Sequence, residues 1–92
     1  MNKPLDYWYK VIPDLDIALD SINNIIDSLP PGSEIATVSL VDEVICQNRR
    51  CYSDKDFYKL KMLCLDIVSE RKDVFMVRGH GVCKKSTRSQ MP

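Results

Sequence analysis

The sequence has few of the residues that mark catalytic or cofactor sites. Its 92 residues include one histidine and three glycines. Neither a P-loop nor a Gly-x-Gly-x-x-Gly pattern is present, and no serine or cysteine stands at a nucleophile-motif spacing from His80. We therefore expect no enzymatic activity and no cofactor.

Long apolar runs are also missing. No stretch approaches the roughly 20 residues that a membrane-spanning helix needs, and the N-terminal segment lacks the uninterrupted apolar stretch of a signal peptide. A composition of 45% hydrophobic and 28% charged residues suits one globular domain of this length. These features predict a cytoplasmic protein without membrane contact.

Cysteine occurs four times but never as a Cys-x-x-Cys pair. With no export signal, we expect free thiols rather than disulfides. A tetrahedral zinc site needs four nitrogen or sulfur ligands, and the candidate set is Cys46, Cys51, His80 and Cys83. The spacing of the first two is at the edge of the range for a zinc knuckle, and the better-spaced His80 and Cys83 do not make a site by themselves. We therefore predict no metal site.

The net charge of zero hides an uneven distribution. The first 43 residues carry two cations and eight acids, a net charge of −6, and the remaining residues carry +6. Such asymmetry is typical of a chain with a polyanionic partner. The plain alternative is a solvated charged surface, to which we assign Lys61 and Arg71.

Three consecutive aromatic residues, Tyr7, Trp8 and Tyr9, stand in an N-terminal segment that ends before Pro13. We treat residues 1–13 as an aromatic arm. It either docks on a second copy in a homodimer or folds back so that Trp8 closes the core.

The main domain is expected over residues 14–85 and begins with an amphipathic helix. Its apolar stripe is Leu15, Leu19, Ile22, Ile26 and Leu29. Asp14 is the expected N-cap, and Pro30-Pro31-Gly32 ends the helix.

Two further helices follow a short β-branched strand over 34–38. Ser39 with Asp42 predicts the capping box of a helix that ends between 46 and 48. Ser53 with Asp56 predicts the start of a third helix that runs to Arg71.

The C-terminal part predicts a β-hairpin. Residues 74–77 and 82–85 have strand character, and the loop between them contains Gly79 and Gly81. We expect these glycines to supply the positive φ of a tight loop. Residues 86–92 are expected to form a polar tail.

This order of helix, strand, helix, turn, helix and hairpin resembles the winged-helix variant of the helix-turn-helix DNA-binding domain. The resemblance implies an α+β fold of three helices and a small C-terminal hairpin. It also implies that the third helix enters the major groove while the hairpin, or wing, contacts the adjacent backbone. The residues that it places on DNA are Arg49, Arg50, Lys55, Lys59, Arg78, His80, Lys84 and Lys85.

The resemblance implies a small regulator of transcription that binds double-stranded DNA, of the kind that a phage or plasmid encodes. A protein-binding adaptor or inhibitor on the same fold is the alternative. Asp54 and Asp56 in the first turn of the third helix would repel phosphates, and Tyr58 and Met62 suit a protein contact as well as a thymine methyl.

Overall fold

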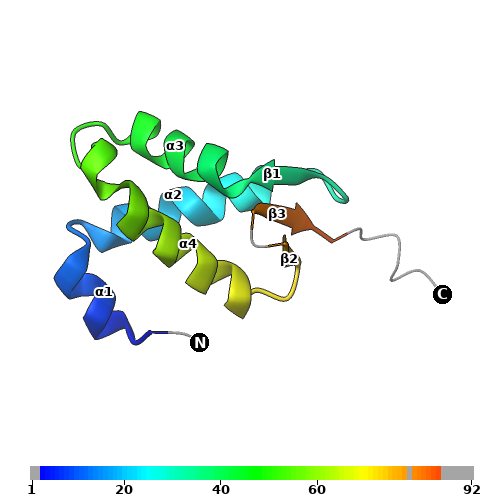
Figure 1. The fold of residues 1–92 in the computed structure, drawn as a ribbon, viewed down its shortest axis with the longest axis horizontal. Coiled ribbons are helices and arrows are strands. Elements are labelled where there is room, and N and C mark those ends of the chain that lie inside the picture. Colours follow the sequence, from blue (N-terminus) through cyan, green and yellow to red (C-terminus); the bar gives the residue numbers. More distant parts are fainter. Residues whose placement is uncertain (1–2, 79, 86–92) are drawn as a thin grey trace.

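Helices and short strands form the fold in the computed structural model, which describes residues 3–78 and 80–85 (Figure 1). The elements are α1 (Leu5–Val11), α2 (Leu15–Ser28), β1 (Glu34–Ala36), α3 (Thr37–Gln47), the 3₁₀ turn η1 (Asp54–Asp56), α4 (Phe57–Glu70), β2 (Val74–Val77) and β3 (Gly81–Lys84). The described part of the chain is therefore α+β, with four α-helices and a three-stranded antiparallel sheet. The sequence predicted three helices, because it left the N-terminal segment unassigned.

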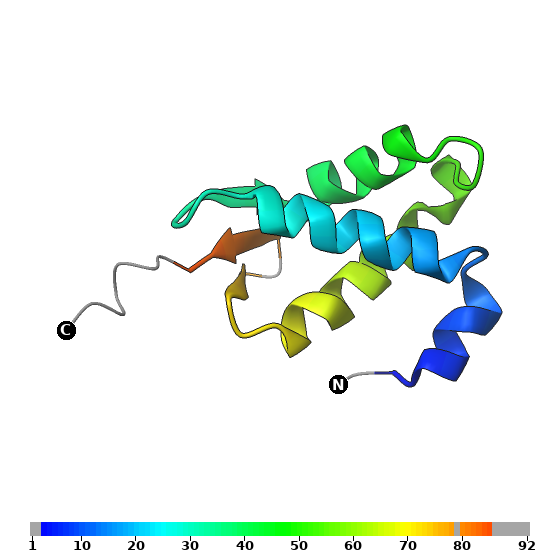
Figure 2. The same ribbon diagram turned by 180° about the vertical axis from the view of Figure 1, so that it is seen from behind.

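The predicted stripe of α2 faces the core. Ile22 and Ile26 are fully buried, and Leu15 is 1% exposed. Full burial of one such side chain contributes about 1.5–3 kcal/mol through removal of apolar surface from water. Viewed from behind, α2 lies in front of the other helices and α3 and α4 pack across it (Figure 2).

Asp14 is the N-cap residue of α2, as predicted, but its side chain makes no capping hydrogen bond. The backbone of Asp14 is left-handed, with φ 54°, at the sharp turn from Pro13 into α2. Aspartate tolerates this conformation better than most residues. The carbonyl oxygen of Asp14 accepts the first helical bond from Ile17, and its carboxylate faces Cys51 instead.

The start of α3 also differs from the prediction. β1 ends at Ala36 and α3 begins at Thr37, so neither the strand to residue 38 nor the Ser39–Asp42 capping box is present. The amide of Thr37 instead donates a 2.7 Å hydrogen bond to the carbonyl oxygen of His80. A contact distant in sequence therefore satisfies one of the free N–H groups at this helix end.

β3 is the central strand of the sheet, in the order β1-β3-β2. Val82 is opposite Ile35 on one side and opposite Met76 on the other, and it is fully buried. The predicted hairpin is thus confirmed, with β3 starting one residue earlier than expected. The sheet lies at the end of the helical layer where α4 ends (Figure 1).

The prediction that both hairpin glycines supply a positive φ is wrong for Gly81, whose φ is not positive. Arg78 supplies a positive φ of 53°, Gly81 lies within β3, and Gly79 is outside the described residues. A Cβ at Gly81 would overlap the carboxylate of Glu34 on the neighbouring strand. The absence of a side chain at Gly81 therefore leaves room for the Glu34 carboxylate. The predicted tail over 86–92 also lies outside the described residues.

The aromatic segment forms a short helix that packs on the core. Trp8 is 3% exposed and belongs to the same buried cluster as Ile12 and Leu15, whereas Tyr7 and Tyr9 are exposed. Of the two alternatives for this segment, Trp8 closing the core is the one observed. A homodimer through the tyrosines stays a prediction.

Candidate nucleic-acid interface

The start of α4 is built as predicted. Ser53 and Asp56 form a reciprocal capping box around η1, and the amide of Ser53 donates to the Asp56 carboxylate over 3.0 Å. One of the two acids in this first turn is therefore engaged with the backbone. Lys55 lies within η1 and is exposed.

The outward face of α4 is uncharged along its centre. Tyr58 is 76% exposed and Met62 is 49% exposed, and the half-buried Leu65 continues the same row. Helical spacing of about 100° per residue puts Lys59 and Lys61 on opposite flanks of this row. Lys59 is exposed, whereas Lys61 is half-buried rather than fully solvated.

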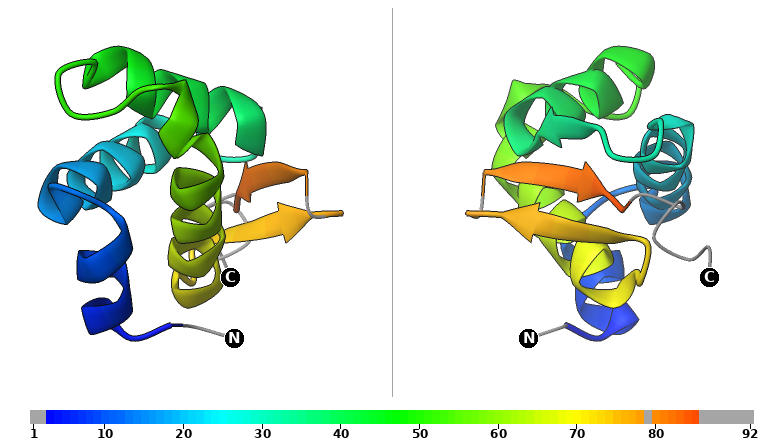
Figure 3. Two further views of the ribbon diagram at one scale, coloured as in Figure 1. Left: turned by 60° about the vertical axis from the view of Figure 1, so that its left-hand side comes forward. Right: turned by 90° about the vertical axis from the view of Figure 1, so that its right-hand side faces the viewer.

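One flank of this face lies against α1. A hollow of about 210 Å³ separates the two helices and is lined by Tyr7, Trp8, Val11, Tyr58, Lys59 and Met62. The other flank lies against the hairpin, whose strands extend from the end of α4 on the side opposite α1 (Figure 3, left). The face of α4 is thus bordered by α1 and β2.

The carboxylate of Asp66, on α4, accepts hydrogen bonds from α1 and from the residue Lys3 before it. Its Oδ2 accepts a 3.0 Å hydrogen bond from the indole Nε1 of Trp8 and a 2.9 Å bond from the amide of Lys3. These two hydrogen bonds hold α1 and the residues before it against α4. Sequence reasoning missed this contact, because nothing in the pattern relates residues 58 positions apart.

Arg49 and Arg50 lie in the turn between α3 and η1, and both are exposed. This turn is anchored by Tyr52, whose hydroxyl lies 2.7 Å from the carbonyl oxygens of both Pro13 and Asp14. Burial, followed by the nearby charges of Cys51 and Asp14, raises the pKa of Tyr52 to about 12. The hydroxyl therefore stays a hydrogen-bond donor at neutral pH.

Three of the four predicted hairpin residues are exposed: Arg78, His80 and Lys85. The loop that carries the first two is fixed to the start of α3 by the bond between the Thr37 amide and the His80 carbonyl. The amide of Lys85 donates to the carbonyl of Asp73 over 2.8 Å, which holds the end of β3 beside the start of β2. These three residues therefore lie on an element that backbone hydrogen bonds hold in place.

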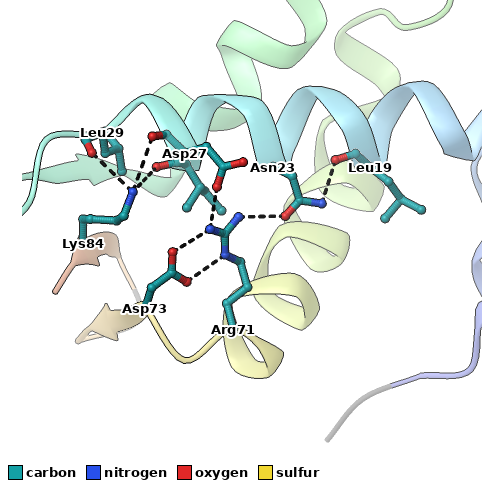
Figure 4. Close-up of polar contacts among 8 residues, drawn as sticks. Leu19, Asn23, Asp27, Leu29, Arg71, Asp73 and Lys84 are labelled. Carbon is teal, nitrogen blue, oxygen red and sulfur yellow. Dashed lines mark hydrogen bonds and ion pairs between the residues drawn. The ribbon is translucent and has the colours of Figure 1, made fainter. Parts of the chain in front are cut away.

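Lys84, the fourth predicted hairpin residue, is half-buried, and its side chain contacts the end of α2. Its ammonium donates to the carbonyl oxygens of Ile26, Leu29 and Asp27 at 3.1, 3.4 and 3.5 Å, at the C-terminal end of α2 (Figure 4). The ammonium thus adds a donor at the end of α2, where the carbonyl oxygen of Ile26 also accepts a hydrogen bond from the amide of Leu29. The strand alternation that brings Val82 into the core also brings Lys84 to the α2 side of the sheet.

Arg71 is not the solvated surface residue that the sequence predicted, because it is 20% exposed within a polar cluster. It makes two bonds to Asp73, at 2.9 and 2.6 Å, one of 2.6 Å to Asp27 and one of 2.9 Å to Asn23 (Figure 4). The hydrogen bond to Asp73 is the main cause of a raised Arg71 pKa, and it lowers the pKa of Asp73 in return. The cluster joins α2, the end of α4 and the start of β2.

The candidate zinc ligands are not brought together. Among residues 3–78 and 80–85, no group of three or more His, Cys, Asp and Glu side chains is arranged to hold a metal ion. The four cysteines are free thiols, and burial raises the pKa of Cys64 to about 12. None of the helices in the described ranges combines the length and apolar character needed to cross a bilayer.

The candidate interface therefore consists of the α4 face, the turn before it and the hairpin. No protein-family model gives a match to the chain, and neither the curated proteins nor the solved structures include a significant match.

Proposed function

We propose that residues 14–85 form a winged-helix domain that binds double-stranded DNA, with α4 in the major groove and the β2–β3 hairpin on the adjacent backbone. In support, α2, β1, α3, α4, β2 and β3 follow one another in the order on which the resemblance rests. α1 is an additional helix that supports α4 from the side.

One observation carries the proposal: the outward face of α4 has an uncharged centre between two cationic flanks. Tyr58 and Met62 form the centre, and Lys59 and Lys61 stand on either side. A major groove has a matching arrangement, because base edges form its floor and phosphates line both rims. A helix of this pattern can approach the bases while its lysines neutralise phosphates.

Further exposed cations extend this surface beyond the helix. Arg49 and Arg50 precede α4, Lys55 lies in its first turn, and Arg78 and Lys85 lie on the hairpin. Cations that neutralise phosphates release counterions, which supplies most sequence-independent affinity. We leave Lys84 out of the contact set because α2 engages its ammonium, and we retain His80 as a contact at the hairpin loop.

A DNA-binding domain of this size can act by occupying a site on DNA. Occupancy of a promoter blocks or recruits other proteins, so we propose regulation of transcription as its role. Fold alone does not decide this, and the proposal depends on the α4 surface.

A protein-binding adaptor is the second candidate, and one observation favours it. Tyr58, Met62 and Phe75 are large apolar side chains that are 76%, 49% and 45% exposed. Exposed aromatic and methionine side chains are enriched in protein interfaces. In that case α4 would bind an apolar surface of a partner, and its lysines would lie at the rim.

Salt dependence separates the two candidates. We propose titration of a random-sequence duplex pool with the full chain at low and moderate salt, followed by the same titration with the double variant Arg49→Ala/Arg50→Ala. Removal of each phosphate contact should flatten the slope of log affinity against log salt by about 0.9. Lys10→Ala is the control, because Lys10 is exposed on α1 and lies outside the proposed contact set.

Absence of duplex binding at low salt would contradict the proposal and leave the adaptor candidate. An equal change of slope per charge removed in the Lys10→Ala control would show that the effect is one of total charge rather than of the α4 surface.

A further inference from the structure

The α4 helix has few of the side chains that read bases by paired hydrogen bonds. All 14 of its residues are described, and none of them is arginine, asparagine or glutamine. Bidentate contacts from Arg or Lys to guanine and from Asn or Gln to adenine are the usual basis of direct readout in the major groove. The two lysines of α4, Lys59 and Lys61, stand on the flanks of its outward face, so recognition at the centre of that face must use other contacts.

What α4 offers instead is a row of apolar side chains. Tyr58, Met62 and Leu65 follow one another at helical spacings of four and three residues, and the first two are 76% and 49% exposed. The Tyr58 ring packs edge-on against Phe57, with ring centroids 5.6 Å apart, and Phe57 packs against the core. The row is thus supported from beneath.

Met62 stands at the middle of this row. It also borders the hollow between α1 and α4, together with Tyr7 and Val11, so it has apolar surface on both sides. Methionine is unbranched and adapts its shape to small apolar partners. Its position makes it the residue of α4 best placed to meet a methyl group on the groove floor.

The major groove presents one kind of apolar group, the C5-methyl of a pyrimidine, among base edges that are otherwise hydrogen-bond donors and acceptors. We infer that α4 recognises C5-methyl groups of pyrimidines, with Met62 as the main specificity-determining residue. This inference rests on the proposed binding of DNA. Thymine and 5-methylcytosine carry the same methyl at the same place, and both present this chemistry.

The test begins with a selection for binding from a random duplex pool that contains thymine and 5-methylcytosine. The selected duplexes are then copied in three forms: unchanged, with uracil in place of thymine, and with unmethylated cytosine. Only methyl groups differ between the copies, so phosphate contacts stay the same. We expect one of the demethylated copies to bind about fourfold more weakly for each recognised methyl group that it lacks.

Substitution of Met62 assigns the effect to α4. Met62→Gln should abolish the difference between the copies, and Met62→Leu should retain it, because leucine keeps an apolar tip of similar volume. Val38→Ala is the control, since Val38 is 50% exposed on α3 and outside the α4 row. Thermal unfolding of each variant checks that it is folded.

The outcomes are distinct. Weaker binding of the uracil copy alone identifies thymine as the source of the methyl, and weaker binding of the unmethylated cytosine copy alone identifies 5-methylcytosine. Equal binding of all three copies overturns the inference while leaving the proposed function intact. Absence of any selected duplex overturns the proposed function itself.

Discussion

The ammonium of Lys84 lies 3.1 Å from the carbonyl oxygen of Ile26, and this contact joins the last strand to the end of α2. A cation at the C-terminus of a helix interacts favourably with the helix dipole and with carbonyls that lack donors. Lys84 thus stabilises the position of β3, whereas the exposed Lys85 beside it is available for a partner.

We expect Lys84→Met to lower the free energy of unfolding by about 0.5–1 kcal/mol, because the methionine cannot satisfy the α2 carbonyls. Lys85→Met should leave stability almost unchanged and should flatten the salt dependence of duplex binding. Urea unfolding and duplex titrations of both variants provide the measurement. Equal reductions in stability would show that the contact with Ile26 contributes nothing.

The contact between Arg71 and Asp73 should make the stability of the protein depend on pH. The hydrogen bond from Arg71 lowers the folded-state pKa of Asp73 below the ordinary 3.8. The stabilisation of the folded protein by the charged Asp73 is therefore complete above pH 3.8, and it is lost as the pH falls through the lowered pKa. Asp73→Asn should destabilise the protein at pH 7 by about 1 kcal/mol, a small value because Asp73 is 44% exposed. Urea unfolding at neutral and strongly acidic pH tests this, and a difference from the parent that persists in acid would contradict it.

The core prediction concerns α2. Ile22 is fully buried, whereas Ile17 on the same helix is 37% exposed. Ile22→Ala should lower stability by about 2–5 kcal/mol because it leaves a cavity, and Ile17→Ala by about 0.5 kcal/mol or less. Thermal unfolding followed by circular dichroism compares the two. Similar destabilisation by both substitutions would mean that the stripe does not face the core.

Trp8 gives a spectroscopic prediction, because it is the only tryptophan and is 3% exposed. Its emission should shift to longer wavelength when the protein unfolds. Trp8→Ala should cost about 3–5 kcal/mol, and Trp8→Phe, which keeps a ring but removes the bond to Asp66, about 1 kcal/mol. Tyr7→Phe is the control on α1, and destabilisation as large as that of Trp8→Phe would argue against a role for the Asp66 bond.

Thiol reactivity should follow burial. Cys46 is exposed, whereas Cys64 is buried with a pKa of about 12. An alkylating reagent at neutral pH should therefore modify Cys46 first and reach Cys64 only after unfolding. Mass spectrometry of peptides from the native and urea-unfolded protein shows the order, and early modification of Cys64 would place it on an accessible surface.

Much of the fold could be predicted because its signals are local. The α2 stripe, the Pro30-Pro31-Gly32 stop, the Ser53–Asp56 capping box and the hairpin all depend on residues close in sequence, and each is observed. The start of α3 could not be predicted, because the amide of Thr37 is satisfied by His80 rather than by a neighbour. α1 was missed because three adjacent aromatics show no helical period, although Pro4 before it and Asp6 in its first turn are typical of a helix start.

The candidate site was harder to predict, since exposure of a cation depends on the whole fold. Two cations differ from their predicted roles: Lys84 was assigned to DNA and Arg71 to solvent, and both instead contact α2. Composition shows that both carry charge, but only the packing of the sheet against α2 determines which oxygen atoms surround that charge.

The sheet order β1-β3-β2 also bears on how the chain acquires its structure during synthesis. β1 and β2 hydrogen-bond only to β3 within the described sheet, and β3 is the last of the three to leave the ribosome. The helices can associate earlier through contacts that are nearer in sequence, whereas pairing of Ile35 with Val82 must close a long loop. A nascent chain that stops before residue 81 would hold two unpaired strands, so both pairings of the sheet must wait for the synthesis of β3.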